Sequence, residues 1–231
     1  MNNTEPRIQI ETSRDFSEIY PGASVGILVL ENVTIQPKAS NLGDAKREII
    51  NGLRKQFPDQ NSLKEHQVIQ AYSRYYKKFD KSYHVLGQLR SMIFEDRPLP
   101  FISPLIEAIF AAELKNMLLT AFHDLDTLIF PLKIRISAGD ETYITLAGEE
   151  KRLKPADMMI SDQRGIISSV IYGPDKQTRV TPSTSRVLVA VYAPEGINRE
   201  KIISHFEDLE KLVRLVSPSC RMTTQTLLPI S

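Results

Sequence analysis

The sequence predicts an α+β protein in which mixed, meandering β-sheets pack against helices. Helical periodicity dominates between Asn41 and Leu119, whereas a period of two dominates from Leu132 to Tyr172. Short turns separate the period-two segments, which favours a meander over βαβ units. The 231 residues fit one integrated domain, with an N-terminal strand and helical part over 1–82 packed on a core over 83–231.

The first strands are expected near the N-terminus. Arg7–Glu11 alternates apolar and polar residues like a short strand. Ala23–Leu30 is almost continuously apolar, which is typical of a strand covered on both faces. One helical turn is expected between them, over Asp15–Tyr20.

Two helices are expected next. Asn41–Phe57 has helical periodicity and is followed by a proline. Ser62 and Glu65 have the spacing of a capping box, which predicts one further helix to Phe79. Both helices carry many lysines and arginines. Such residues usually form a solvated face, and an RNA-binding face is the alternative interpretation.

A third and a fourth helix are expected over His84–Ile93 and Leu105–Leu119. Ser103 is a favourable N-cap for the fourth helix, and a proline follows in its first turn. This helix is apolar around most of its circumference, so it should be buried. Its polar members are therefore informative, because a buried carboxylate must be paired or face a ligand; they are Glu107, Glu113 and Asn116.

The segment Thr120–Asp126 is expected at the end of the fourth helix. It places His123 beside Asp124, a combination that suits a general base or a metal. Ligands so close in sequence seldom converge on a metal without further partners. We therefore expect no metal site and favour hydrogen-bonding and capping roles.

The second half of the chain reads as strands and one closing helix. Strands are expected over 133–137, 142–146, 157–160, 165–172 and 187–192. Asn198 then caps an amphipathic helix to Val216, and a last short strand is expected over Thr226–Leu228.

Ile171–Arg186 is the most chemically varied stretch of the chain. Gly173, Pro174 and Asp175 predict a turn. Hydroxyl and guanidinium groups then crowd together at Thr178, Arg179, Thr181, Ser183, Thr184 and Arg186. Either a small polar ligand is held at the rim of a sheet, or the stretch is a solvated hairpin loop.

Composition limits the function classes. The net charge of +1 provides no global attraction to DNA or to a membrane, so RNA contact would need a local basic face. The single cysteine, Cys220, excludes an internal disulfide framework. The first residues lack a signal-peptide pattern, which leads us to expect a cytoplasmic protein. Nucleotide-binding loops and common hydrolase motifs are missing, so we expect no cofactor.

One family resembles this chain from Tyr83 to Ile197: the B3/B4 domain of the phenylalanyl-tRNA synthetase beta subunit, here in a free-standing form. The resemblance rests on the order and spacing of four segments, HVLGQLRSMIFEDRPLPFISPLIEAI, LLTAFHDLDTL, YITLAGEEKRLKPADMMISD and SSVIYGPDKQTRVTPSTSRVLVAVYAPEGI. In that family the domain is a three-layer α+β unit that hydrolyses tRNA wrongly charged with tyrosine.

The resemblance implies a pocket between the helix that ends at Leu119 and the strands that flank Gly173. It also implies chemistry on an aminoacyl ester, with a positioned water, a bound ammonium group and an oxyanion stabilised by backbone N–H groups. The family's glycine falls at Gly173. Its histidine falls near Ala121 and its glutamate at Ala190.

The first functional hypothesis is therefore a protein that binds tRNA or aminoacyl-tRNA and deacylates mischarged tRNA in trans. In this hypothesis His123 or Asp124 positions the water. A carboxylate meets the ammonium group and an arginine meets a phosphate. The expected ligand-binding residues are Asn116, Thr120, Asp162, Tyr172, Gly173, Pro174, Asp175, Thr178, Arg179, Thr184 and Arg186.

Two alternatives belong to other classes. The same pocket can serve a non-catalytic module that binds a free amino acid or another small metabolite. The fold can also be retained as an interaction surface. Steep salt dependence of tRNA binding favours the first hypothesis, because only RNA binding needs several phosphate contacts.

Overall fold

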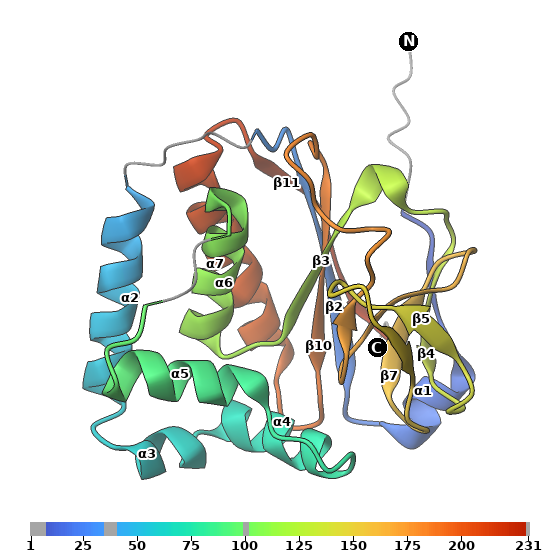
Figure 1. The fold of residues 1–231 in the computed structure, drawn as a ribbon, viewed down its shortest axis with the longest axis horizontal. Helices are drawn as coiled ribbons and strands as arrows, with labels where there is room; N and C mark the ends of the chain where they lie inside the picture. Colours follow the sequence, from blue (N-terminus) through green and yellow to red (C-terminus); the bar gives the residue numbers. More distant parts are fainter. Residues whose placement is uncertain (1–7, 35–40, 99–101, 230–231) are drawn as a thin grey trace.

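Two larger sheets, a two-stranded hairpin and a layer of helices form the protein. The structure is a computed structural model that describes residues 8–34, 41–98 and 102–229. Figure 1 shows helices α6 (Pro104–Asn116) and α7 (Arg199–Val216) on one face of a four-stranded sheet, with a second sheet on its other side. Helix α2 (Leu42–Gln56) stands alongside α6 and α7. The predicted α+β class is confirmed. None of the described helices is long and apolar enough to cross a membrane.

The four-stranded sheet forms the centre of the molecule. The strand order is β11-β2-β10-β3, and neighbouring strands are antiparallel. The bounds are β2 (Ser24–Glu31), β3 (Thr120–Asp124), β10 (Val187–Ala193) and β11 (Arg221–Leu228). Strand β10 is buried throughout, and β2 is buried except at its last residue, because helices cover one face and the second sheet covers the other.

The five-stranded sheet contains the predicted meander. Strands β4, β7, β8 and β9 are successive antiparallel neighbours, and β1 adds to β4 in parallel. The bounds are β1 (Ile10–Thr12), β4 (Leu132–Ile136), β7 (Met158–Ser161), β8 (Ile166–Ser169) and β9 (Gly173–Pro174). Position 7, where the first strand was expected to begin, lies outside the described residues. A separate hairpin pairs β5 (Thr142–Ile144) with β6 (Glu150–Arg152).

The stretch from Ile171 to Arg186 is not a hairpin loop. Strand β8 belongs to the five-stranded sheet and β10 to the four-stranded sheet, so the stretch crosses between sheets. Gly173 and Pro174, which were expected in a turn, form the short strand β9. Asp175, Thr178 and Thr184 are all less than 7% exposed, which contradicts the interpretation as a solvated loop.

Two helix predictions need correction. The expected helix from Ser62 to Phe79 is two helices, α3 (Gln60–Glu65) and α4 (Gln67–Lys77). Asp59 is the N-cap of α3, and Ser62 is the partner that completes its capping box. His66 between the helices is extended, so the helical hydrogen bonds stop there. Helices α1 (Arg14–Ile19) and α5 (His84–Phe94) lie close to their predicted positions.

The segment that contains His123 is a strand and not a helix end. Helix α6 begins at the predicted cap Ser103 but ends at Asn116, because Met117 adopts left-handed backbone angles. The chain then extends as β3 and closes in a short 3₁₀ turn, Leu125–Thr127. Alternate side chains of β3 therefore point to opposite faces of the sheet.

Four buried tyrosines connect the layers, and we call them the tyrosine row: Tyr72, Tyr75 and Tyr76 on α4, and Tyr83 just before α5. Tyr72 donates a hydrogen bond to a carbonyl in β10 at 2.5 Å, and Tyr76 donates to the carbonyl after β8 at 2.8 Å. Tyr75 donates to the Asp157 carboxylate at 2.7 Å, and Tyr83 to the carbonyl after α6 at 3.0 Å. One continuous apolar core, with members from both 1–82 and 83–231, surrounds the row.

Candidate functional site

A cavity of about 430 Å³ lies between the C-terminal half of α6, strand β3 and the chain around β9. Both Leu119 and Gly173 line it, so it occupies the place that the sequence implies for a pocket. Gly173 has a φ of 78°, a backbone conformation that strongly favours glycine. Four predicted ligand-binding residues line this cavity, namely Thr120, Tyr172, Gly173 and Pro174. We call it the apolar cavity.

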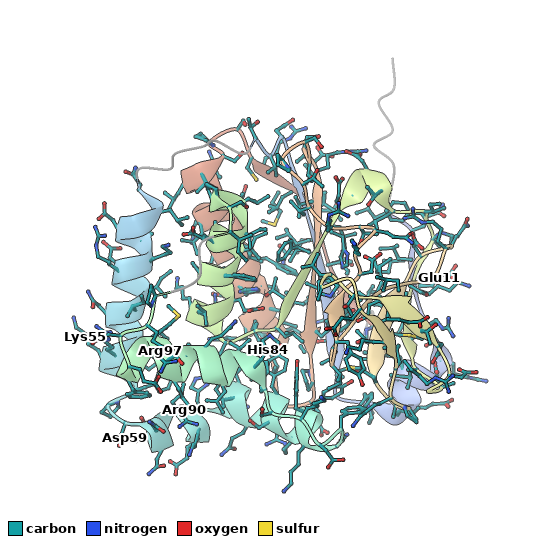
Figure 2. The ribbon with its side chains drawn as sticks, in the orientation of Figure 1. Glu11, Lys55, Asp59, His84, Arg90 and Arg97 are labelled. Atoms are coloured by element: carbon teal, nitrogen blue, oxygen red, sulfur yellow. The ribbon has the colours of Figure 1, made fainter. Side chains whose placement is uncertain are left out.

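Aromatic and aliphatic side chains form most of its wall. The rings of Phe110 and Phe122 meet edge to face with centroids 6.2 Å apart. Leu146 is 51% exposed and contributes to the rim, as does the exposed His84 at the start of α5 (Figure 2). The lining includes no lysine and no arginine among the described residues. The cavity therefore suits an apolar group better than an anion.

Among the residues that the structure describes, Glu113 is the one carboxyl group that lines the apolar cavity. The side chain is 3% exposed, and its Oε2 accepts a hydrogen bond from the Thr120 N–H at 2.8 Å. Burial raises the pKa of Glu113 to about 8, although the hydrogen bond from Thr120 opposes this rise. The carboxyl group is therefore mostly protonated at neutral pH, and a bound cation would favour its ionised form.

Two alanines stand where the family resemblance implies polar side chains. Ala121 lines the apolar cavity, and Ala190 lies directly opposite it in the register of β3 and β10. These are the positions at which the family's histidine and glutamate fall. The fold brings the two positions together, yet neither supplies a functional group. The carboxyl group of this cavity comes from α6 instead, at Glu113.

His123 is fully buried in β3 and lines none of the cavities described here. Its Nδ1 lies 2.6 Å from the Thr178 hydroxyl, which in turn donates to the Asp175 carboxylate. Its Nε2 has no hydrogen-bond partner among the described residues. Burial lowers the pKa of His123 to about 3, so the imidazole is neutral.

Asp124 is held by the protein itself. Its Oδ2 accepts a hydrogen bond from the Thr184 hydroxyl at 2.6 Å, and its Oδ1 accepts one from the Asp126 N–H at 3.1 Å. Arg186 pairs with Asp126, with its Nε 2.8 Å from the carboxylate. These contacts tie the end of β3 to the chain that enters β10. A catalytic role for His123 or Asp124 stays a prediction.

A second, more polar cavity of about 400 Å³ is lined by β5, by the chain that leads into β8 and by the chain that follows β9. Three predicted ligand-binding residues line it: Asp162, Asp175 and Thr178. Arg164 pairs with Asp162 at 3.0 Å. Burial raises the pKa of Asp175, against the opposing effect of its hydrogen bonds from Thr178. Ile144 lines this polar cavity, whereas Leu146 lines the apolar one.

The remaining predicted ligand residues lie elsewhere. Asn116 faces α7, where its Nδ2 donates to Asp208 at 2.9 Å. Arg179 is exposed and donates to the carbonyl of Lys176 at 2.8 Å. Across the described ranges, no group of three or more His, Cys, Asp or Glu side chains is arranged to hold a metal.

Sequence reasoning missed part of the wall of the apolar cavity. Phe110 and Phe122 look like ordinary core residues, because their sequence gives no sign that a cavity separates them from the next layer. Glu113 did carry a signal, since a carboxylate on an otherwise apolar helix must be paired or face a ligand. Only the fold shows that it borders a cavity.

Comparison with known proteins places these observations in a family. The family model described as B3/4 domain matches residues 68–209. The chain is 28% identical over 69 residues to the phenylalanine–tRNA ligase beta subunit of Mycoplasma genitalium. This match covers 30% of this chain and 9% of that protein. An N-terminal fragment of the phenylalanyl-tRNA synthetase beta subunit from Pyrococcus horikoshii has a similar fold. Its TM-score is 0.50 at 13% identity, and the match covers 96% of this chain and 55% of the fragment.

Proposed function

The chain belongs to the B3/4 domain family, and from that premise we propose that it binds aminoacyl-tRNA and hydrolyses the ester of a wrongly attached amino acid in trans. The apolar cavity is the observation that supports this proposal most. It has room for an amino acid side chain, it has one buried carboxyl group, and it stands between Leu119 and Gly173. The related proteins named above act on phenylalanine and tRNA, which suggests the substrate class.

The charge of the lining favours an esterified amino acid over a free one. Both carry an ammonium group, which the Glu113 carboxylate can bind once it loses its proton. A free amino acid also carries a carboxylate, which would need a cation that the lining of the apolar cavity does not provide. An ester has a neutral carbonyl at that position. The alternative of a free-amino-acid module in this cavity is therefore less well supported.

We assign activation of the water to the substrate's own groups, namely the free hydroxyl beside the ester on the terminal ribose. The alanines at 121 and 190 offer no base, and His123 and Asp124 do not line the apolar cavity. Glu113 then acts by holding the ammonium group and so orienting the ester. Glu113 is thus a binding residue in this proposal.

The test is hydrolysis of a panel of correctly and wrongly charged tRNAs, with tyrosine-charged phenylalanine tRNA included. Wild type should release the amino acid selectively from a mischarged member. Glu113→Gln should lower kcat/KM by about 10- to 100-fold, because it removes a charged hydrogen bond to the ammonium group. Glu149→Gln, at an exposed carboxylate, is the matched control and should leave the rate unchanged.

The same assay separates the catalytic assignments. If His123 positions the water, His123→Ala should slow hydrolysis by about 100-fold or more while the protein stays folded. An unchanged rate would rule that role out. If the folded protein hydrolyses no member of the panel, the deacylase proposal fails, and thermal-shift screening with amino acids then tests the binding-module alternative.

A further inference from the structure

A third cavity, of about 550 Å³, lies between α2, α6 and α7. Figure 1 shows α2 standing beside the α6–α7 pair, and this cavity lies where the three helices face one another. We call it the helical cavity. None of its lining residues lines the apolar cavity, so the two are separate sites. The predicted ligand residue Asn116 lies here.

The floor of the helical cavity is apolar. Ile49 and Leu53 come from α2, and Leu212 comes from α7. Leu53 and Leu212 are buried, whereas Ile49 is partly exposed. A water-filled space over such a floor keeps apolar surface hydrated, and an apolar ligand group would remove that surface from water.

Lys201 is the distinctive polar group of the helical cavity. It is partly buried, and among the described residues no carboxylate lies within salt-bridge distance of it. The nearby Asp208 is already held by Lys115 at 2.7 Å and by Asn116 at 2.9 Å. Burial lowers the pKa of Lys201, against the opposing effect of the Asp208 carboxylate, and the neighbouring Lys115 adds to the decrease. The ammonium group thus lacks the partner that a partly buried charge requires.

We propose that the helical cavity binds a small carboxylic acid with an apolar body, whose carboxylate pairs with Lys201 and whose body covers Ile49, Leu53 and Leu212. The ligand is anionic because Lys201 has no carboxylate within salt-bridge distance among the described residues, whereas Lys115 pairs with Asp208 and Lys211 with Glu207. A cationic ligand would meet an Asp208 that is already paired with Lys115 and a Glu48 that is exposed to solvent. This inference does not depend on the proposed deacylase activity.

The chain offers a variant that fills the helical cavity without strain. Gly52 lines the cavity from within α2, and a Cβ added there meets no atom within 4 Å. Gly52→Leu should therefore close the cavity while it favours the helix. Gly87 in α5 has equally open surroundings but lines none of the cavities described here, so Gly87→Leu is the matched control.

Amide NMR titration of the full chain tests the proposal with three probes. 3-Phenylpropionate has both parts of the ligand, phenethylamine lacks the carboxylate, and acetate lacks the apolar body. Only 3-phenylpropionate should cause saturable shifts, and they should centre on Gly52, Leu53, Lys201 and Leu212. Gly52→Leu should abolish these shifts, Lys201→Gln should weaken binding by about 10-fold or more, and Gly87→Leu should leave it unchanged.

Three results would overturn the proposal. They are the lack of saturable shifts up to about 10 mM probe, equal binding of phenethylamine, or shifts that survive Gly52→Leu in a folded protein. A fourth probe, L-phenylalanine, identifies the source of the carboxylate. Binding as tight as that of 3-phenylpropionate supports a free amino acid, and weaker binding supports a carboxylic acid without an amino group.

Discussion

Replacing Glu113 by glutamine should change how the stability of the protein depends on pH. Glu113 has a pKa near 4.5 in an unfolded chain and about 8 in the folded protein, where burial favours the protonated form. Between these values the folded protein holds a proton that the unfolded chain has released. Stability contributed by this group is therefore lost as pH rises from 4.5 to about 8.

The size of the effect follows from the two pKa values. One pKa unit is worth about 1.4 kcal/mol, so the full loss is on the order of 5 kcal/mol, of which about 2 kcal/mol falls between about pH 6 and about pH 8. Glutamine has almost the same shape, can still accept the Thr120 N–H bond and does not ionise. Glu113→Gln should therefore gain about 2 kcal/mol relative to wild type over that interval.

The difference between the two proteins isolates this one group. Burial lowers the pKa of His123 and of His205 to about 3, so their contribution to stability rises with pH, with the opposite sign to Glu113. Burial also raises the pKa of Asp157 to about 6. All three are shared by wild type and variant and cancel in the difference. Urea unfolding at three pH values measures the difference in unfolding free energy between wild type and Glu113→Gln. A difference that stays constant with pH would refute the protonated, buried state of Glu113.

Substitutions at three further positions test packing and hydrogen bonding by urea unfolding. Gly26→Ala should cost about 1–3 kcal/mol, because the added Cβ would lie 2.6 Å from Ile202 and 2.8 Å from Phe206; an unchanged midpoint would contradict this packing. Thr178→Val removes the hydroxyl between a buried imidazole and a buried carboxylate and should cost about 2–3 kcal/mol; a neutral effect would mean that water replaces it. Asn198→Ala should cost about 1 kcal/mol, since its side chain caps α7, and Asn198→Asp should retain that stability.

Local sequence patterns were sufficient for most single elements. The continuous apolar runs predicted the buried strands β2 and β10, and side-chain caps predicted the starts of α6 and α7. The partner of each strand was harder, because an apolar pattern says that a strand is buried but not which sheet buries it. Strands β9 and β10 follow each other in the chain yet lie in different sheets, which is why the interpretation of Ile171–Arg186 as a hairpin loop is wrong.

The candidate site was predictable in position but not in composition. The family resemblance located the pocket between Leu119 and Gly173, where the apolar cavity lies. It could not show that His123 would be buried against Thr178 and would not line that cavity. Ala121 and His123 share a face of β3, yet only Ala121 lines the cavity, because His123 packs against Thr178 instead. Glu113 needed the tertiary fold, because only the packing of α6 against β3 brings its carboxyl group to the cavity wall.

The tyrosine row determines how the molecule can come apart. Its hydroxyl groups bond to β10, to the carboxylate just before β7, to the chain after β8 and to the end of α6. Detaching helix α4 would break three of these bonds and expose buried aromatic rings in the same event. The two sheets should therefore open together, and amide hydrogens on both should exchange with solvent at one common, slow rate. Residues of both sheets line the apolar cavity, so it should keep its shape until the two sheets separate.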